Sequence, residues 1–426
     1  MPGRVVILAS GTTISPFGDP ADEMWFAGET IKETQDRAVR RIGFEVVRVA
    51  DPEAASVAVR EALGRPVILM LDRIFVSEKA LADFVTASTK VGAPAALALA
   101  INASVEYTLP LQDVRREGEV ITHDVVRVDG AKLPEPSTDP VVWIHAVRDA
   151  ARTCLVPKRE IVIDVPLPVI GDRDQAKMRY PITSTVVVSL EHWIHVLELN
   201  QISFGILWIE LIRRRPLWAL WRAITAFSLS FDRVLERMVA RGRRGSIHPM
   251  AYLSGSLIGD DVVIGAHATV KNSYVGSGTV VSDHAVLLNT VIGPRSLITE
   301  NTFLVSCVAF PEVSLGNYKL QVSLIGRGAY VNAWASFVDA RFDGAVKVNH
   351  RGVLVSSERS FLGSVVGHRA KMASKVLIQP GREIPNDTVV VMRPDEIVSI
   401  VPPELPKGVP LVRDRGTLVP LGKESK

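Results

Sequence analysis

The sequence lacks the features of disulfide-stabilised, secreted and nucleic-acid-binding proteins. Its 426 residues include only two cysteines, Cys154 and Cys307, which exclude a disulfide framework. The 49 lysines and arginines are nearly balanced by 46 acidic residues, so the net charge of +3 gives no reason to expect a nucleic-acid partner. The apolar run after Arg4 is too short for a signal peptide, and we expect a cytoplasmic protein.

What the sequence does have is a regular repeat, in which an aliphatic residue and a glycine recur at equal intervals at Ile258-Gly259, Val275-Gly276 and Ile292-Gly293. Apolar residues follow one another at steps of six, six and five, at Ile258, Ile264, Val270, Val275, Val281, Leu287, Ile292, Ile298 and Leu304. A second run occupies Val366, Met372, Ile378, Ile384 and Val390. A chain that turns every five or six residues, with one apolar side chain inward per face, forms a triangular parallel β-helix. We predict a left-handed β-helix over residues 246–400.

Residues 1–165 predict an open, Rossmann-like α/β sheet. Apolar runs at 4–8, 44–49, 66–71 and 95–100 indicate buried strands, and the segments 29–42, 53–63 and 77–90 indicate helices between them. In such a sheet, ligands bind outside the carboxyl ends of the strands. The glycine turn after the first strand is therefore a candidate binding loop.

Three segments of this domain resemble, in order, the pattern of sugar-phosphate nucleotidyltransferases: residues 6–11 (VILASG), 26–31 (FAGETI) and 69–72 (LMLD). Followed by a hexapeptide β-helix, this order resembles the bifunctional family of UDP-N-acetylglucosamine pyrophosphorylase and glucosamine-1-phosphate acetyltransferase. The resemblance implies that the loop with Leu8, Ala9 and Gly11 holds nucleotide phosphates. It also implies that Asp72 binds Mg²⁺, which neutralises charge on the attacked phosphate.

The chain departs from this pattern where the family carries positive charge. Thr12 and Thr13 stand in place of an arginine, and no lysine–proline pair precedes Gly28. Loss of cationic donors weakens the stabilisation of a phosphoryl-transfer transition state. Asp72 has a second interpretation as a turn residue at a strand end, and the Gly11 loop as a simple tight turn. Candidates for a second metal carboxylate are Asp124 and Asp164.

A second resemblance lies in the β-helix, between residues 341 and 384. The segments 341–349, 361–367 and 379–384 are similar to the acetyltransferase end of the same family. The resemblance implies a homotrimer in which acetyl-CoA or another acyl-CoA binds near Arg341, Lys347 and Gly363. The family's catalytic histidine has no counterpart in the segment 315–320 (LGNYKL), where Tyr318 and Lys319 either take its place or belong to a surface loop.

Between the two domains, residues 166–245 predict a helical linker. Its part from residue 190 contains four of the seven tryptophans and nine arginines, and the helical pattern breaks at Pro216. The longest stretch without a formal charge, Leu199–Ile209, falls far short of a membrane-spanning helix. One interpretation is peripheral contact of residues 190–245 with anionic lipid. The other is a linker whose Trp and Ile side chains pack against the end of the β-helix while its arginines face water.

Two histidines stand one repeat apart. His267 and His284 occupy the same corner of successive coils, where they either bind zinc with Asp283 or form a polar ladder facing solvent. We expect His248, His350 and His368 to be surface residues. The Pro-rich tail, residues 401–426, predicts an extended arm.

The sequence is compatible with three functions. The first is a sugar-phosphate nucleotidyltransferase-like protein of nucleotide-sugar and cell-envelope metabolism, using Mg²⁺, with acyl-CoA-dependent transfer at the β-helix as an additional activity. The second is a non-catalytic scaffold or regulatory relative, and the third an acyltransferase acting on another acceptor.

Overall fold

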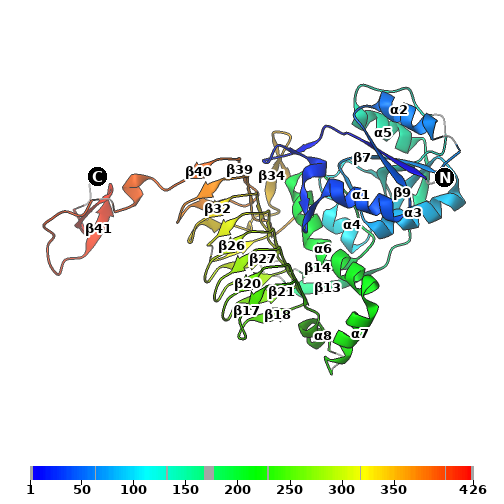
Figure 1. Ribbon diagram of the computed structural model, residues 1–426. Coiled ribbons are helices and arrows are strands. Elements are labelled where there is room, and N and C mark those ends of the chain that lie inside the picture. Colours follow the sequence, from blue (N-terminus) through cyan, green and yellow to red (C-terminus); the bar gives the residue numbers. More distant parts are fainter. Residues whose placement is uncertain are drawn as a thin grey trace.

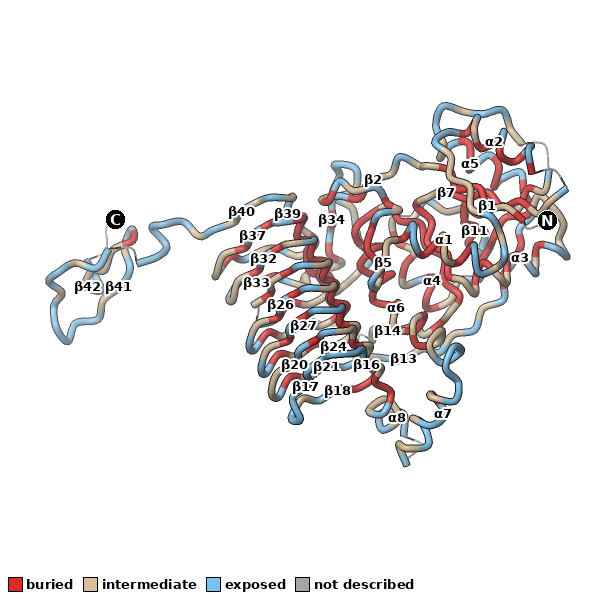
Figure 2. Tube along the Cα trace, in the orientation of Figure 1, coloured by how far each residue is buried: buried red, intermediate tan, exposed pale blue. Residues whose placement is uncertain are grey.

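The computed structural model describes residues 3–62, 64–130, 133–166, 177–227, 230–316, 318–398 and 400–423. An N-terminal α/β unit lies beside a long stack of short strands, and a buried helix separates the two (Figure 1). Buried residues form one band inside the α/β sheet and a second along the axis of the stack (Figure 2).

A mixed sheet forms the centre of the α/β unit, in the order β12-β9-β11-β7-β1-β6. Its strands are β1 (Arg4–Leu8), β6 (Glu45–Val49), β7 (Val67–Leu71), β9 (Ala95–Ala100), β11 (Val120–Arg127) and β12 (Arg152–Leu155), and β10 (Arg115–Glu117) pairs with β11. The four predicted strands are confirmed. β11 was not predicted, and it runs antiparallel to both of its neighbours, with a register shift between Thr122 and Val126.

Helices flank this sheet and begin after capping side chains. They are α1 (Ile31–Arg41), α2 (Pro52–Glu61), α3 (Glu78–Val91), α4 (Ala103–Thr108) and α5 (Pro140–Asp149). The side chains of Thr30, Asp51, Ser77, Asn102 and Asp139 accept the first N–H groups of these helices. The helices predicted at 29–42, 53–63 and 77–90 are confirmed within a few residues.

The strand order places a switch point between β1 and β7. From β1 the chain passes through α1 to β6 on one side, and it then returns through α2 to β7 on the other side. The carboxyl ends of β1 and β7 therefore face loops that lead away in opposite directions. This is where an open α/β sheet offers a binding crevice.

Three parallel sheets form the C-terminal stack, as a parallel β-helix requires. The first contains β16 (Ala240–Arg241), β19 (Leu257–Ile258), β22 (Tyr274–Val275), β25 (Val291–Ile292), β28 (Val308–Ala309), β31 (Leu324–Ile325), β36 (Val365–Val366) and β39 (Glu383–Ile384). The second contains β17 (Ser246–Ile247), β20 (Val263–Ile264), β23 (Val280–Val281), β26 (Leu297–Ile298), β29 (Ser314–Leu315), β32 (Tyr330–Val331), β37 (Lys371–Met372) and β40 (Val389–Val390). The third contains β18 (Tyr252–Ser254), β21 (Thr269–Lys271), β24 (Val286–Leu288), β27 (Phe303–Val305) and β30 (Leu320–Gln321).

The repeat sets the register and the core of this stack. Leu257 pairs with Tyr274, and Tyr274 with Val291, each one repeat further on. All nine predicted inward residues between 258 and 304 are buried, which confirms the pattern of six, six and five. The glycines are needed because coils approach closely: a Cβ on Gly276 would lie 2.4 Å from the backbone nitrogen of Pro294.

The helix α6 (Trp193–Arg214) joins the two parts and is buried through most of its length. It packs in one apolar cluster with the β4–β5 hairpin (Trp25–Phe26 and Glu29–Thr30) and with the first sheet of the β-helix, including Val291 and Val308. It therefore packs mainly against the flank of the β-helix. The expected contact with the end of the β-helix is also present, because Nε1 of Trp208 donates to the carbonyl of Gly255 in the first coil (3.1 Å). The predicted break at Pro216 is confirmed, because α7 (Pro216–Ile224) starts there and is followed by α8 (Phe231–Arg237).

Several short two-stranded sheets complete the fold. β2 (Thr13–Ile14) pairs with β3 (Asp19–Pro20), β13 (Glu160–Pro166) with β14 (Lys177–Thr183), β8 (Ile74–Val76) with β15 (Val187–Ser189), β33 (Ser336–Phe337) with β38 (Leu377–Ile378), and β34 (Lys347–His350) with β35 (Val353–Ser356). The pairing of β15 with β8 continues the N-terminal unit beyond residue 165. The tail differs from a plain extended arm, because β41 (Leu411–Asp414) and β42 (Thr417–Pro420) form a hairpin.

None of the helices in the described ranges combines the length and apolar character needed to cross a membrane.

Candidate functional site

The loop after β1 is held by bonds within the protein. The N–H of Ala9 donates to the carbonyl of Val49 (3.0 Å), and that of Ser10 to Oδ1 of Asp72 (2.9 Å). The N–H of Thr12 donates to the hydroxyl of Ser10 (3.2 Å). Gly11 is exposed, with φ +67°. Three of the N–H groups that would hold phosphate in a nucleotide loop are thus already engaged.

Asp72 lies at the carboxyl end of β7, where it fixes this loop. Burial and then the negative charge of Asp72 raise the pKa of Asp22, although Arg48 lies 3.4 Å from the Asp22 carboxylate. Two carboxylates that repel each other in this way favour a divalent cation between them. Among the described residues, however, no group of three or more histidine, cysteine or acidic side chains is arranged to hold a metal ion. The magnesium role of Asp72 stays a prediction.

The turn with Gly28 lies away from the loop, at the contact with the β-helix. The N–H of Ala27 donates to Oδ1 of Asn200 on α6 (3.0 Å). Gly28 has φ +108°, and a Cβ there would come within 2.5 Å of the Tyr274 hydroxyl. This close approach, rather than phosphate binding, explains a glycine at this position.

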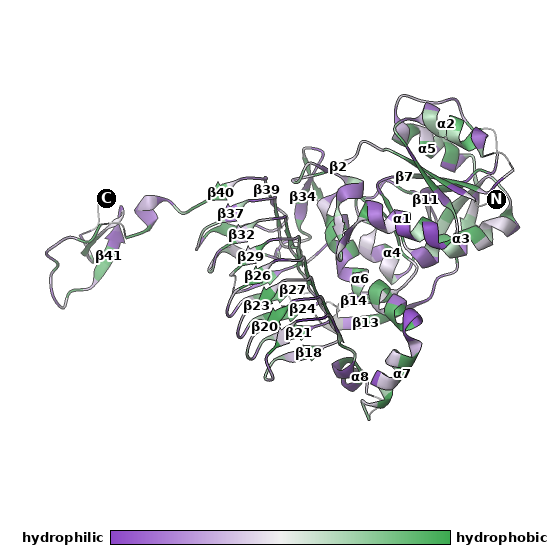
Figure 3. Ribbon diagram, in the orientation of Figure 1, coloured by the Kyte–Doolittle hydropathy of each residue, from purple (hydrophilic) through white to green (hydrophobic). Residues whose placement is uncertain are grey.

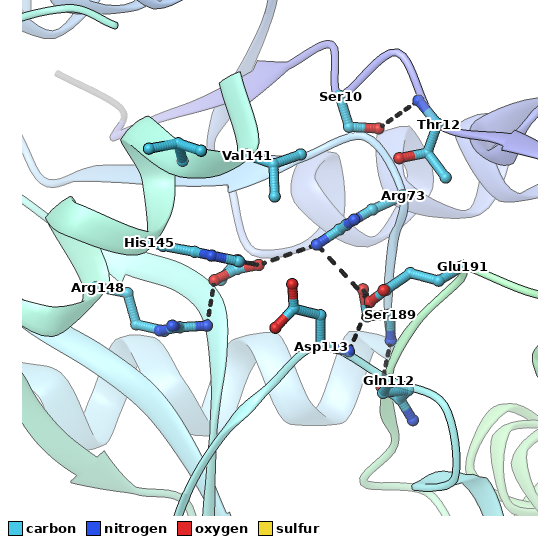
Figure 4. A network of polar contacts seen from close by, with 12 residues as sticks. Ser10, Thr12, Arg73, Gln112, Asp113, Val141, His145, Arg148, Ser189 and Glu191 are labelled. Carbon is cyan, nitrogen blue, oxygen red and sulfur yellow. Dashed lines mark hydrogen bonds and ion pairs between the residues drawn. The ribbon is translucent and has the colours of Figure 1, made fainter. Parts of the chain in front are cut away.

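A buried polar cluster adjoins the loop at the switch point (Figure 4). Arg73 follows Asp72, and its Nη2 lies 3.6 Å from Oδ2 of Asp124 and 3.7 Å from Oε1 of Glu191. Asp124 also receives a hydrogen bond from Nη1 of Arg148 (2.9 Å) and lies 3.3 Å from Nε2 of His145. The three side chains of Arg73, Asp124 and Glu191 are almost fully buried.

Several atoms of this cluster have no hydrogen-bond partner. They are Nε and Nη2 of Arg73, Nε2 of His145 and Oε2 of Glu191, and their side chains meet at one place in the fold. Nη2 of Arg73 and Nε2 of His145 still face carboxylates at ion-pair distance, and Oε2 of Glu191 lies 4.0 Å from Nη2 of Arg351. The other oxygen of Glu191 accepts from the Ser189 hydroxyl (2.7 Å) and from the N–H of Asp113 (3.0 Å). A buried donor or acceptor without a partner costs about 1–3 kcal/mol. Hydrogen-bonding capacity that the protein itself does not fill is therefore concentrated at this place.

The two candidates for a second metal carboxylate differ in environment. Asp124 lies on β11 between Arg148, Arg73 and His145, so its negative charge is already compensated. Asp164 is exposed on β13. The sequence reasoning did not single out Arg73, His145 or Glu191. The position of Arg73, directly after a buried strand and Asp72, was the available signal.

Of the residues predicted at the acyl-CoA end, Lys347 and Gly363 are linked through the backbone and not through side chains, since Gly381 donates to the carbonyl of Gly363 (2.6 Å) and approaches that of Lys347. Arg341 pairs with Asp343 (2.5 Å), and the side chain of Lys347 is exposed on β34. Gly363 packs so tightly that a Cβ would lie 2.4 Å from the carbonyl of Gln321. In the described ranges, no hydrogen bond or ion pair connects these three residues, and their role stays a prediction.

Two histidines of the β-helix stack on each other at the corners of successive coils, and a third lies at the contact with the N-terminal unit. The rings of His267 and His284 stack with centroids 5.1 Å apart, as predicted for equivalent corners. His368 was expected at the surface, and that expectation was wrong. It is buried, its Nε2 lies 2.9 Å from Asp19, and its ring stacks on Phe17 from the N-terminal unit. Burial lowers the pKa of His368.

A cavity of about 310 Å³ lies between the two parts of the molecule. Arg359 donates to Oε1 of Glu198 (2.6 Å) at its wall, and the other oxygen of Glu198 has no partner. Burial raises the pKa of Glu198 to about 7, although Arg359 opposes this effect. The Arg359 guanidinium also donates to the carbonyl of Tyr107 and lies over its ring. These contacts fasten the β-helix to α4 and α6.

Comparison of the chain with protein-family models and with curated proteins finds no match. No family is assigned.

Proposed function

We propose that this protein binds a sugar phosphate or nucleotide sugar at the switch point, as a nucleotidyltransferase-like protein of nucleotide-sugar metabolism. The supporting observation is the set of polar atoms on Arg73, His145 and Glu191 that make ion-pair contacts at most and no hydrogen bond, near the carboxyl ends of β1 and β7. The order of an α/β domain followed by a parallel β-helix is that of the resembled family.

The chemistry of the cluster suits a phosphorylated sugar. The fork of the Arg73 guanidinium matches phosphate oxygens, which accept two parallel hydrogen bonds. Oε2 of Glu191 accepts a bond from a sugar hydroxyl, and the hydroxyls of Ser10 and Thr12 face the same region (Figure 4). Asp22 and Asp72 are the residues that would hold Mg²⁺ together with phosphates, where the ion would neutralise their charge.

A specific observation favours a second function, a non-catalytic scaffold or regulatory protein. The loop N–H groups of Ala9, Ser10 and Thr12 bond within the protein, so a triphosphate would find few donors there. Acyl transfer at the β-helix has less support, because no side-chain contact between Arg341, Lys347 and Gly363 is found in the described ranges and the segment 315–320 contains no histidine.

Release of pyrophosphate tests whether the site works as a transferase. Purified protein is incubated with Mg²⁺, the common nucleoside triphosphates and a panel of sugar 1-phosphates. A working transferase releases pyrophosphate with at least one pair, and Asp72→Asn lowers the rate at least roughly a hundredfold, the scale of a lost charge-stabilising group. Ligand binding without release would retain the binding proposal and support the scaffold.

The β-helix also leads us to propose a homotrimer. The first sheet is covered by α6, but the second presents an outward apolar row of Val263, Val280, Leu297, Tyr330 and Val389, all exposed. Such a row on a monomer marks an interface with other copies.

We expect light scattering to give the mass of three chains for the unmodified protein. The double variant Val280→Lys, Leu297→Lys should have the mass of a single chain. The control Leu354→Lys, on an exposed hairpin, should remain trimeric, and an unchanged mass in the double variant would contradict this interface.

A further inference from the structure

The helix α7 presents an apolar stripe to solvent. Leu217, Leu220, Trp221 and Ile224 follow at helical spacing, so they lie on one face, and all four are exposed. Leu217 is 80% exposed, and Phe227 beyond the helix is 91% exposed. Figure 3 shows this helix with apolar and polar residues side by side. Exposed apolar surface of this size normally marks a contact site.

The charged residues within the segment that carries the stripe are all arginines. Between Glu210 and Asp232 the chain has four arginines, at 213, 214, 215 and 222, and no acidic residue. Arg214 pairs with Glu210 (3.1 Å), which orients it at the end of α6. The guanidinium of Arg222 lies 5.7 Å from the centre of the Trp218 ring.

A basic cavity adjoins the same helix. It has a volume of about 400 Å³, and its walls include Arg222, Arg237 and Arg241. The acidic side chain in its wall, Glu236, accepts a hydrogen bond from the Tyr252 hydroxyl (2.9 Å). Three guanidinium groups face one carboxylate, so the cavity is suited to an anion such as a phosphate group.

We propose that residues 213–227 bind the surface of an anionic phospholipid bilayer. The apolar stripe enters the boundary between headgroups and acyl chains, the arginines meet the negative surface, and the basic cavity accepts a lipid phosphate. The helix α7 is too short to span a bilayer, so it lies along the surface. The part of α6 before Arg213 takes no part, because it is largely buried against the α/β unit and the β-helix.

A bilayer suits this surface better than a second copy of the chain. A continuous arginine-rich segment without acidic residues matches a uniformly negative surface, whereas protein surfaces carry charges of both signs. The outward row of the second sheet already provides a separate face for other copies.

Vesicle sedimentation with the full chain tests the proposal. We expect binding to vesicles of phosphatidylcholine with phosphatidylserine, weaker binding at high salt, and no binding to phosphatidylcholine alone. Leu217→Ser with Leu220→Ser should lower the partition coefficient about a hundredfold, from the loss of two buried leucines. Arg237→Gln with Arg241→Gln should lower it roughly tenfold. The matched control, Leu377→Ser with Val391→Ser, removes two equally exposed apolar side chains elsewhere and should bind normally.

Three results would overturn the proposal. They are absence of binding to anionic vesicles, equal loss in the stripe and control variants, and a change of oligomeric mass in the Leu217→Ser, Leu220→Ser protein. The last result would assign the stripe to a second copy of the chain. Folding of each variant is checked by thermal unfolding, because these side chains are exposed and their loss should leave the melting temperature unchanged.

Discussion

Replacing Trp193 by alanine is expected to lower the free energy of unfolding by about 3–5 kcal/mol. Trp193 is fully buried at the start of α6, in the apolar cluster that joins the α/β unit to the β-helix. Its Nε1 donates to Oε1 of Glu383 in the β-helix (3.1 Å). The substitution therefore creates a cavity and removes the donor to a partly buried carboxylate. Denaturant unfolding followed by circular dichroism measures the loss.

Trp221→Ala is the matched control. Trp221 is 65% exposed on α7, so the same substitution there should change the free energy of unfolding by less than about 1 kcal/mol. Equal effects in the two variants would mean that α6 does not hold the two parts together. An effect of Trp193→Ala below about 1 kcal/mol would contradict the buried interface.

Replacing Arg73 by glutamine is expected to weaken the binding of a sugar 1-phosphate by roughly ten- to a hundredfold. A hydrogen bond to a charged group contributes about 1.5–3 kcal/mol, and Nε and Nη2 of Arg73 have no other hydrogen-bond partner. Isothermal titration calorimetry measures the dissociation constant. The control Arg60→Gln removes an exposed arginine from α2 and should bind like the unmodified protein.

A second variant separates ligand contact from loss of folding. Glu191→Gln keeps the size of the side chain and an oxygen for Ser189 and Asp113, but it places an amide where a sugar hydroxyl would donate. It should weaken binding of the sugar phosphate more than binding of inorganic phosphate. Unchanged affinity in both Arg73→Gln and Glu191→Gln would contradict a ligand in this cluster.

The β-helix could be predicted from the sequence because its determinants are local and repeated. One inward residue per face and a glycine at close approaches recur in successive coils, and each coil repeats the same contacts. The predicted strands of the α/β domain were also local apolar runs. β11 escaped prediction because its pairing with β7 and β9 depends on contacts between distant segments and on a register shift within the strand.

Only part of the candidate site could be predicted from the sequence. The position of the loop and of Asp72 follows from the rule on strand ends, but the partner of Arg73, Glu191, lies far along the chain on the segment that leads into α6. The burial of His368 could not be predicted either, because it depends on Asp19 and Phe17 from the opposite end of the sequence. Pairings of this kind are set by how the two domains pack, which no local pattern encodes.

A crystal structure grown with a sugar 1-phosphate is the most direct test of the switch-point site. The account predicts phosphate density within hydrogen-bond distance of Nε and Nη2 of Arg73, and a sugar hydroxyl near Oε2 of Glu191. Ordered water alone at these atoms, or the ligand bound elsewhere, would contradict it.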